Sequence, residues 1–201
     1  MKLATPRTLI TASMIAASII ATIGPSHASA ASYAVDGSHT SVVFSISHLG
    51  YSYTYGMFRK NSGSFEFDPD NPAACAFNFT VDVASLDTMD PKRDEHLRNA
   101  DFFNAKQFPQ ITFRSESVRK TTGEDGKPVY EATGPLTMHG VTKQATLPMT
   151  FLGEGPGPYG NYRTGFLCRT SFKRSDFGMN FMVGPIGDNV GVTISFEGIR
   201  Q

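Results

Sequence analysis

Strict alternation of apolar and polar side chains is the feature that most constrains this fold. In residues 42–48, every second residue falls on one apolar face, and a second run starting at Cys75 repeats the pattern through Phe77, Phe79, Val81 and Val83. Successive side chains of a β-strand point to opposite faces, so this pattern predicts half-buried antiparallel strands. Similar runs at 111–119, 129–138, 145–151, 162–172 and 190–196, with 53–67 as one long bent strand or a hairpin, predict eight or nine strands.

Glycine and proline separate these runs, as expected for turns between strands. They cluster at 68–72, 123–126 and 153–158. His139-Gly140 has the length of a two-residue hairpin loop, and residues 123–127 suit a longer one. We find no internal repeat and no shift in composition that would mark a domain boundary, which predicts a single domain from residue 31 to residue 201.

One segment departs from the β pattern. Asp90-Pro91 can cap and start a helix, and residues 92–100 contain no β-branched side chain. We expect a short helix there, with a second turn opening at 101–103 and ending at Pro109. An all-β chain with one helical crossover is typical of a closed barrel, in which ~8 strands leave room for one ligand. A two-sheet sandwich is the structural alternative.

The chain contains 16 phenylalanines and no tryptophan. Phenylalanine contributes apolar area without a polar atom. Two interpretations stay open: the rings fill an ordinary barrel core, or they form the wall of a long apolar cavity. The second favours lipid binding over catalysis.

The first 30 residues resemble a secretory signal peptide. Lys2 and Arg7 precede an apolar run at 9–23, and Ala28-Ser29-Ala30 suits cleavage before Ala31. The run is interrupted and too short for a typical membrane span, although an uncleaved anchor is an alternative. We expect an exported, periplasmic protein without stable membrane insertion. Without Lys2 and Arg7 the chain has 16 basic and 18 acidic side chains, a net charge of −2. Such a charge gives no positive field that would attract nucleic acid.

The two cysteines, Cys75 and Cys168, would then reside where disulfides persist. Both fall on the apolar face of predicted strands, which leaves two interpretations open: two buried free thiols, or one disulfide between them. We favour the free thiols, because strand interiors seldom give disulfide geometry.

Motifs for catalysis or metal binding are missing from the sequence. The histidines His39, His48, His96 and His139 show no metal-binding spacing, and no nucleophile elbow or phosphate-binding loop occurs. Acidic residues at 87, 90, 94 and 95 lie beside the basic residues at 92, 93 and 98, which indicates a solvated helix face or, alternatively, the polar rim of a pocket. We therefore expect no enzyme, no metal and no cofactor.

Several motifs together resemble the YceI-like family of periplasmic polyisoprenoid-binding proteins. They cover nearly the whole chain after residue 31, and the most distinctive lie in its centre. The motifs are Val35-Asp36-Gly37-Ser38-His39-Thr40, residues 43–50, 56–58, 63–65, 85–88, 93–98, Asp101-Phe102-Phe103, 108–113, 134–143 and 174–179. Cys75, Cys168, Asn99 and Pro135 depart from what we expect of the family.

The resemblance implies a lipocalin-like, extended antiparallel β-barrel around a deep apolar tunnel for an isoprenoid lipid such as a quinone or prenyl phosphate. Members of the family are similar to carriers. An enzyme that modifies such a lipid and a protein-interaction barrel without ligand are the alternatives, and a homodimer stays open. Combining the resemblance with the strand faces, we expect the ligand to contact Phe44, Ile46, His48, Phe58, Phe79, Val81, His96, Leu97, Phe102, Phe103 and Phe113.

Overall fold

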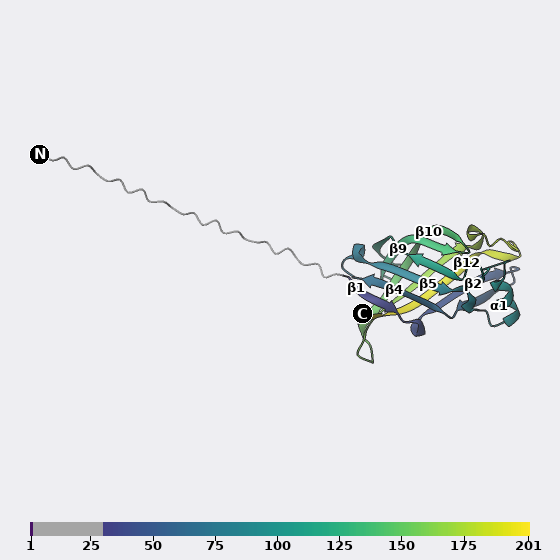
Figure 1. The fold of residues 1–201 in the computed structure, drawn as a ribbon, viewed down its shortest axis with the longest axis horizontal. Helices are drawn as coiled ribbons and strands as arrows, with labels where there is room; N and C mark the ends of the chain where they lie inside the picture. The colour runs from purple at the N-terminus through teal and green to yellow at the C-terminus, as the bar shows by residue number, and fades with distance from the viewer. Residues whose placement is uncertain (2–29) are drawn as a thin grey trace.

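The computed structural model describes Met1 and residues 30–201, so the signal peptide predicted at 1–30 lies almost entirely outside the described residues and stays a prediction. The described part forms antiparallel strands and one short α-helix (Figure 1). The strands are β1 (Ala31–Val35), β2 (Ser41–His48), β3 (Ser52–Phe58), β4 (Asn61–Phe67), β5 (Ala76–Asp82), β6 (Leu86–Asp87), β7 (Gln110–Arg114), β8 (Ser117–Thr122), β9 (Pro128–Met138), β10 (Val141–Pro156), β11 (Tyr162–Lys173) and β12 (Ile186–Arg200).

Eight strands close into a barrel, in the order β1, β4, β5, β7, β9, β10, β11, β12. The ring closes because β12 pairs with both β11 and β1. This confirms the predicted barrel of about eight strands and excludes the sandwich. Closure leaves no sheet edge around this ring, which removes a common site of aggregation.

The barrel is lengthened at one end by strands that continue the ring. β12 pairs with β1 near residue 199 and with β2 over Ile186–Ser195, so β1 and β2 form consecutive parts of one long strand. On the other side of that long strand, β3 pairs with β2 and β4 pairs with β1. The predicted run at 53–67 is therefore one long strand with a break at residues 59 and 60, whereas the hairpin lies between β2 and β3.

The predicted hairpin loop at His139-Gly140 is confirmed. Met138 pairs with Val141, and both loop residues have positive φ, at 51° and 75°. Two left-handed residues give a turn whose twist matches that of the flanking strands. The longer predicted loop at 123–127 is also present, because the N–H of Gly123 donates to the carbonyl of Lys127 at 2.8 Å.

The single strand predicted at 111–119 is wrong, because the chain forms two strands there. β7 lies between β5 and the second half of β9 and pairs with both, whereas β8 pairs with the first half of β9. Between them, Ser115 uses its backbone N–H and its hydroxyl to bind the backbone of Phe77. Beyond Ser115 the pairing with β5 ends, and the chain pairs with an earlier part of β9. Hydrophobic periodicity does not report this change, which breaks the strand.

The predicted helix is confirmed as α1 (Pro91–Arg98). The side chain of Asp90 accepts hydrogen bonds from the N–H groups of Lys92 and Arg93, which caps the first turn. The second turn expected at 101–109 is present as a series of turns. α1 lies at the end of the barrel opposite the C-terminus (Figure 1).

A dense aromatic cluster fills the other end of the barrel. Phe166 lies at its centre, and its ring centroid is 5.0 to 5.7 Å from those of five other phenylalanines, Phe65, Phe67, Phe77, Phe151 and Phe196. Most of these contacts are edge-to-face, the arrangement that aromatic quadrupoles favour. This half of the barrel therefore has no room for a ligand.

Both cysteines are buried, free thiols, which agrees with the preferred interpretation. Burial raises the pKa of the Cys168 thiol to about 12, and burial is also the main cause of the raised pKa of Cys75. A neutral, buried thiol is a poor nucleophile.

We expect Cys168 to resist iodoacetamide in the folded protein at mildly alkaline pH, because the thiolate is the reactive form and the pKa lies well above that pH. Peptide mapping by mass spectrometry, with and without denaturant, checks this. Rapid modification of Cys168 without denaturant would contradict the burial.

A cavity beneath the short helix

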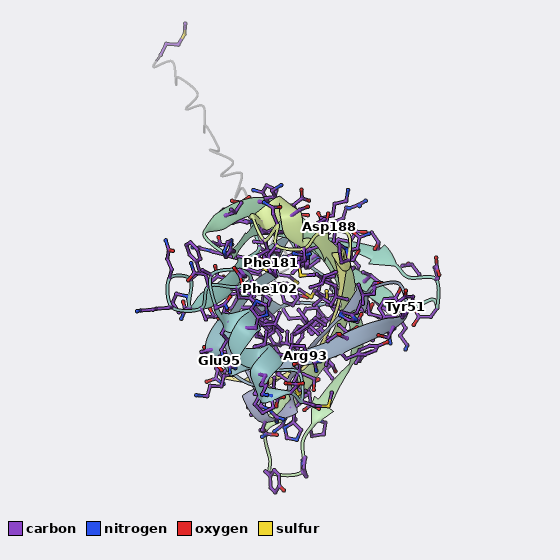
Figure 2. The ribbon with its side chains drawn as sticks, turned by 90° about the vertical axis from the view of Figure 1, so that its right-hand side faces the viewer. Tyr51, Arg93, Glu95, Phe102, Phe181 and Asp188 are labelled. Carbon is purple, nitrogen blue, oxygen red and sulfur yellow. The ribbon has the colours of Figure 1, made fainter. Side chains whose placement is uncertain are left out.

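A cavity of about 380 Å³ occupies the end of the barrel that carries α1. Its wall is built from the inward faces of the strands, from α1 and from the segment between residues 179 and 186, which joins β11 to β12. Figure 2 looks onto this end, where Phe102 and Phe181 lie near the centre. Phenylalanine rings, aliphatic side chains and methionines form this wall together.

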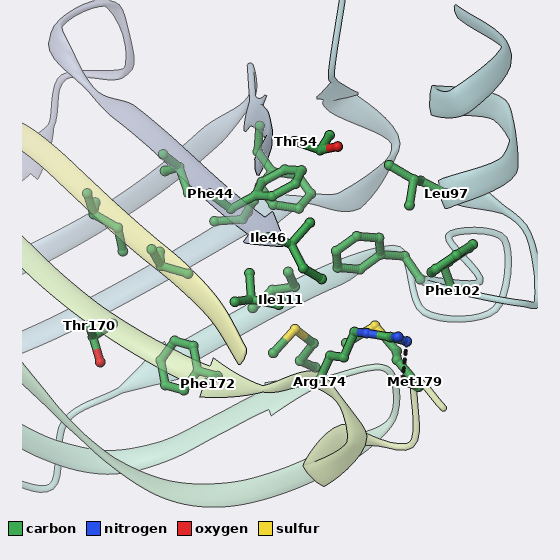
Figure 3. Close-up of a pocket in the computed structure, with 18 of the residues that line it drawn as sticks. Phe44, Ile46, Thr54, Leu97, Phe102, Ile111, Thr170, Phe172, Arg174 and Met179 are labelled. Atoms are coloured by element: carbon green, nitrogen blue, oxygen red, sulfur yellow. Dashed lines mark hydrogen bonds between the residues drawn. The ribbon is translucent and has the colours of Figure 1, made fainter. Parts of the chain in front are cut away.

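All eleven residues expected at the ligand site line this one cavity: Phe44, Ile46, His48, Phe58, Phe79, Val81, His96, Leu97, Phe102, Phe103 and Phe113. As predicted, the inward side chains are the even-numbered ones on β2 and the odd-numbered ones on β5. Leu97 on α1 and Phe102 in the turns after it lie on the cavity wall (Figure 3), and Phe103 follows in the same turns. That these side chains contact a ligand stays a prediction.

The two interpretations of the phenylalanines apply to different halves of the barrel. Nine line the cavity, and the rings around Phe166 fill the core. Phe79, Phe113 and Phe196 do both, since they belong to the buried core and also form the inner end of the cavity. Phe79 packs against Phe196 with ring centroids 4.7 Å apart.

Sequence reasoning missed a large part of the wall. Four missed side chains follow the same alternation on β12, and applying the period of two there would have found them: Val190, Val192, Ile194 and Phe196. The missed residues also include Met138 on β9, Met149 on β10 and Phe172 on β11. Met179, Phe181 and Met182 lie in an irregular segment, where no periodic signal exists.

Six side chains bring polar atoms to the wall, and none of them is a carboxylate: His48, Thr54, Arg93, His96, Thr170 and Arg174. Nε2 of His96 lies 2.9 Å from a carboxylate oxygen of Asp101, so this imidazole is occupied by a partner outside the cavity. The cavity is thus an apolar chamber whose few polar groups include two guanidinium donors.

Arg174 is a buried cation that binds backbone carbonyls. Its Nη1 donates to the carbonyl of Met179 at 2.7 Å (Figure 3) and to that of Phe181 at 2.8 Å. Its Nε donates to the carbonyl of Gly187 and its Nη2 to that of Ile186. Burial lowers the pKa of its guanidinium. Arg174 therefore holds the segment at 179–187 against the barrel.

The acidic cluster is only partly the solvated helix face that the sequence indicated. Asp94 is buried, and its carboxylate accepts hydrogen bonds from the N–H and hydroxyl of Thr88. Arg93 donates to the same threonine through Nε at 2.8 Å and to its carbonyl at 2.7 Å. For Asp94 the prediction is wrong, because this network fixes α1 to the segment after β6.

Met1 and residues 30–201 contain no group of three histidine, cysteine or acidic side chains arranged to hold a metal ion. In the same residues no helix has both the length and the hydropathy needed to cross a bilayer.

Comparisons with known proteins agree with this architecture. The sequence profile of the YceI-like domain matches residues 33–198. Protein YceI of Escherichia coli O17:K52:H18 is 44% identical over 174 residues, which cover 86% of this chain and 88% of the relative. The crystal structure of Burkholderia cenocepacia BcnA matches with a TM-score of 0.69 and 28% identity, over 81% of this chain and 98% of that one.

A third match shares the fold at low sequence identity. It is a polyisoprenoid binding domain from Saccharophagus degradans implicated in plant cell wall breakdown, with a TM-score of 0.64 and 12% identity, over 84% of this chain and 98% of that one.

Proposed function

Because the chain belongs to the YceI-like family, we propose that it binds an isoprenoid lipid in the cavity beneath α1 and serves as a carrier or reservoir for that lipid. The observation that carries the proposal is the cavity wall, which is formed almost entirely by aliphatic side chains, methionines and nine phenylalanines. Each buried methylene contributes ~0.8 kcal/mol, so a chain of about twenty such groups would offset the several kcal/mol lost on ordering the ligand.

The polar end of the ligand is a hydrogen-bond acceptor in this proposal. Arg93 and Arg174 reach the cavity wall, and the residues that line it include no carboxylate. Arg174 spends four of its five N–H groups on carbonyls, which leaves one donor. A quinone carbonyl or a prenyl phosphate would satisfy such donors, whereas a ligand amine would be repelled.

The carrier acts in the periplasm in this proposal, after removal of residues 1–30. The signal features of that segment support the location. Binding rather than catalysis is favoured because the polar groups on the cavity wall include no nucleophile with an adjacent base.

Organic extraction of the protein purified from its native cells is expected to release one long-chain isoprenoid in near-stoichiometric amount. Mass spectrometry of the extract identifies it. As a control, the same extraction is applied to a variant with a carboxylate in the wall, Ile46→Asp, which is expected to release none. Release of no lipid from the unaltered protein, or of short-chain soluble products only, would contradict the proposal.

A further inference from the structure

An uncharged apolar rim surrounds part of the cavity mouth. The turn between β2 and β3 exposes Leu49 and Tyr51, and the segment before β12 exposes Phe181, Met182 and Val183. We call these five residues the mouth rim. The two segments meet, because the N–H of Leu49 donates to the carbonyl of Pro185 at 2.7 Å. Tyr51 and Phe181 both lie at the end seen in Figure 2.

The mouth rim is continuous with the cavity. Leu49, Phe181 and Met182 line the cavity and are also exposed to solvent, whereas Tyr51 and Val183 do not line it. Leu49 and Met182 have φ values of 55° and 52°, the left-handed conformation that non-glycine residues seldom adopt. The chain thus keeps exposed apolar side chains here in spite of both hydration and backbone strain.

Neither segment of the rim carries charge. Residues 49–58 and 177–187 contain no Asp, Glu, Lys, Arg or His. At about 200 Å² for a large side chain, the exposed fractions of the five rim residues correspond to roughly 500 Å². That is as large as the biggest apolar patches of ordinary monomers, which often mark interaction sites.

We propose that the mouth rim docks transiently on the surface of a lipid bilayer, so that an isoprenoid passes between membrane and cavity without crossing water. This inference rests on the proposed function. Tyrosine, phenylalanine and methionine without neighbouring charge suit the bilayer interface, where aromatic rings are enriched. An isoprenoid lipid is stored in a bilayer, and a carrier must reach it there.

A second copy of the chain fits the rim less well. A stable protein interface buries ~800 Å² on each partner, more than the rim offers. A copy seated on the rim would also cover the mouths of both cavities. A bilayer instead presents an apolar phase like the cavity interior, so docking leaves the lipid path open.

Flotation with phosphatidylcholine vesicles tests the docking. The protein as purified from cells is expected to float with the vesicles, and added NaCl is not expected to release it, because the rim is uncharged. The double variant Tyr51→Ser and Val183→Ser is expected to lower the partition constant about tenfold. The control is Tyr159→Ser: this tyrosine is 87% exposed against 90% for Tyr51, but lies in the loop between β10 and β11 at the opposite end of the barrel.

Four results would overturn the docking: no flotation of the unaltered protein, equal loss in the Tyr159→Ser control, flotation only with phosphatidylglycerol that salt reverses, or a dimer in sedimentation equilibrium that the rim variant dissociates. A separate assay, equilibrium loading with a fluorescent prenol delivered from ethanol, reports on the cavity alone. The rim variant should load normally. Failure of the unaltered protein to load would contradict the proposed function, whereas failure to float with normal loading would contradict only the docking.

Discussion

Replacing Ile46 with aspartate is expected to weaken the binding of a long-chain isoprenoid by at least ~100-fold, or about 2.7 kcal/mol. Ile46 lies on β2 with its side chain on the cavity wall, between those of Phe44 and His48. A carboxylate at this position must either lose its water against an alkyl chain or keep the chain out. Fluorescence titration with a labelled prenol measures the affinity.

The fold is expected to survive this change, which separates binding from stability. Ile46 is not part of the closely packed core around Phe166, and without ligand an open cavity admits water to the new carboxylate. The matched control is Tyr53→Asp on the neighbouring strand β3, where the side chain is exposed on the outer face. An Ile46→Asp protein that binds the prenol as tightly as the Tyr53→Asp protein would place the ligand elsewhere.

Substitution of Arg174 with methionine is expected to lower the free energy of unfolding by about 3 to 5 kcal/mol, since it removes four hydrogen bonds from carbonyls near the cavity mouth. For a chain of this size that corresponds to a fall of about 10 °C in Tm. Lysine is not expected to rescue the loss, because its three donors radiate from one nitrogen and do not reproduce the planar guanidinium fork.

Substitution of Arg174 is also expected to increase local motion in the segment that this residue holds. Amide hydrogen exchange should accelerate most in residues 179–187, the segment that Arg174 holds, and least around Phe166. Differential scanning calorimetry and exchange mass spectrometry measure the two effects. The control is Lys173→Met, one residue earlier on the surface. An Arg174→Met protein as stable as that control, with unchanged exchange in this segment, would contradict the role assigned to Arg174.

The barrel and about a third of the cavity wall, 11 of its 31 residues, could be predicted from local patterns. The period of two on β2 and β5 set which side chains face inward, and Asp90-Pro91 set where α1 begins. His139-Gly140 set the register of the longest hairpin. Each of these signals is carried by residues within a few positions of one another, and so it can be read from the sequence without knowing any partner.

Partner choice was decided only by the tertiary structure. The break at Ser115 exists because β7 pairs with both β5 and β9, whereas β8 pairs with an earlier part of β9. Pairing between such distant segments cannot be read from local sequence. Asp94 looked like a surface carboxylate, yet it is buried because α1 packs on Thr88. The same holds for the division of the phenylalanines between core and cavity, since a ring on an inward face has the same sequence pattern in both.

The mouth of the cavity shows this limit most clearly. Residues 179–186 have no period, and their place over the barrel depends on a buried cation, Arg174, whose four acceptors are all backbone carbonyls. A carbonyl is common to every residue, so no choice of side chain in that segment signals the contact. Local side-chain patterns therefore determined the strands and their inward faces, whereas the closure of the barrel end was decided by hydrogen bonds from the Arg174 side chain to backbone carbonyls.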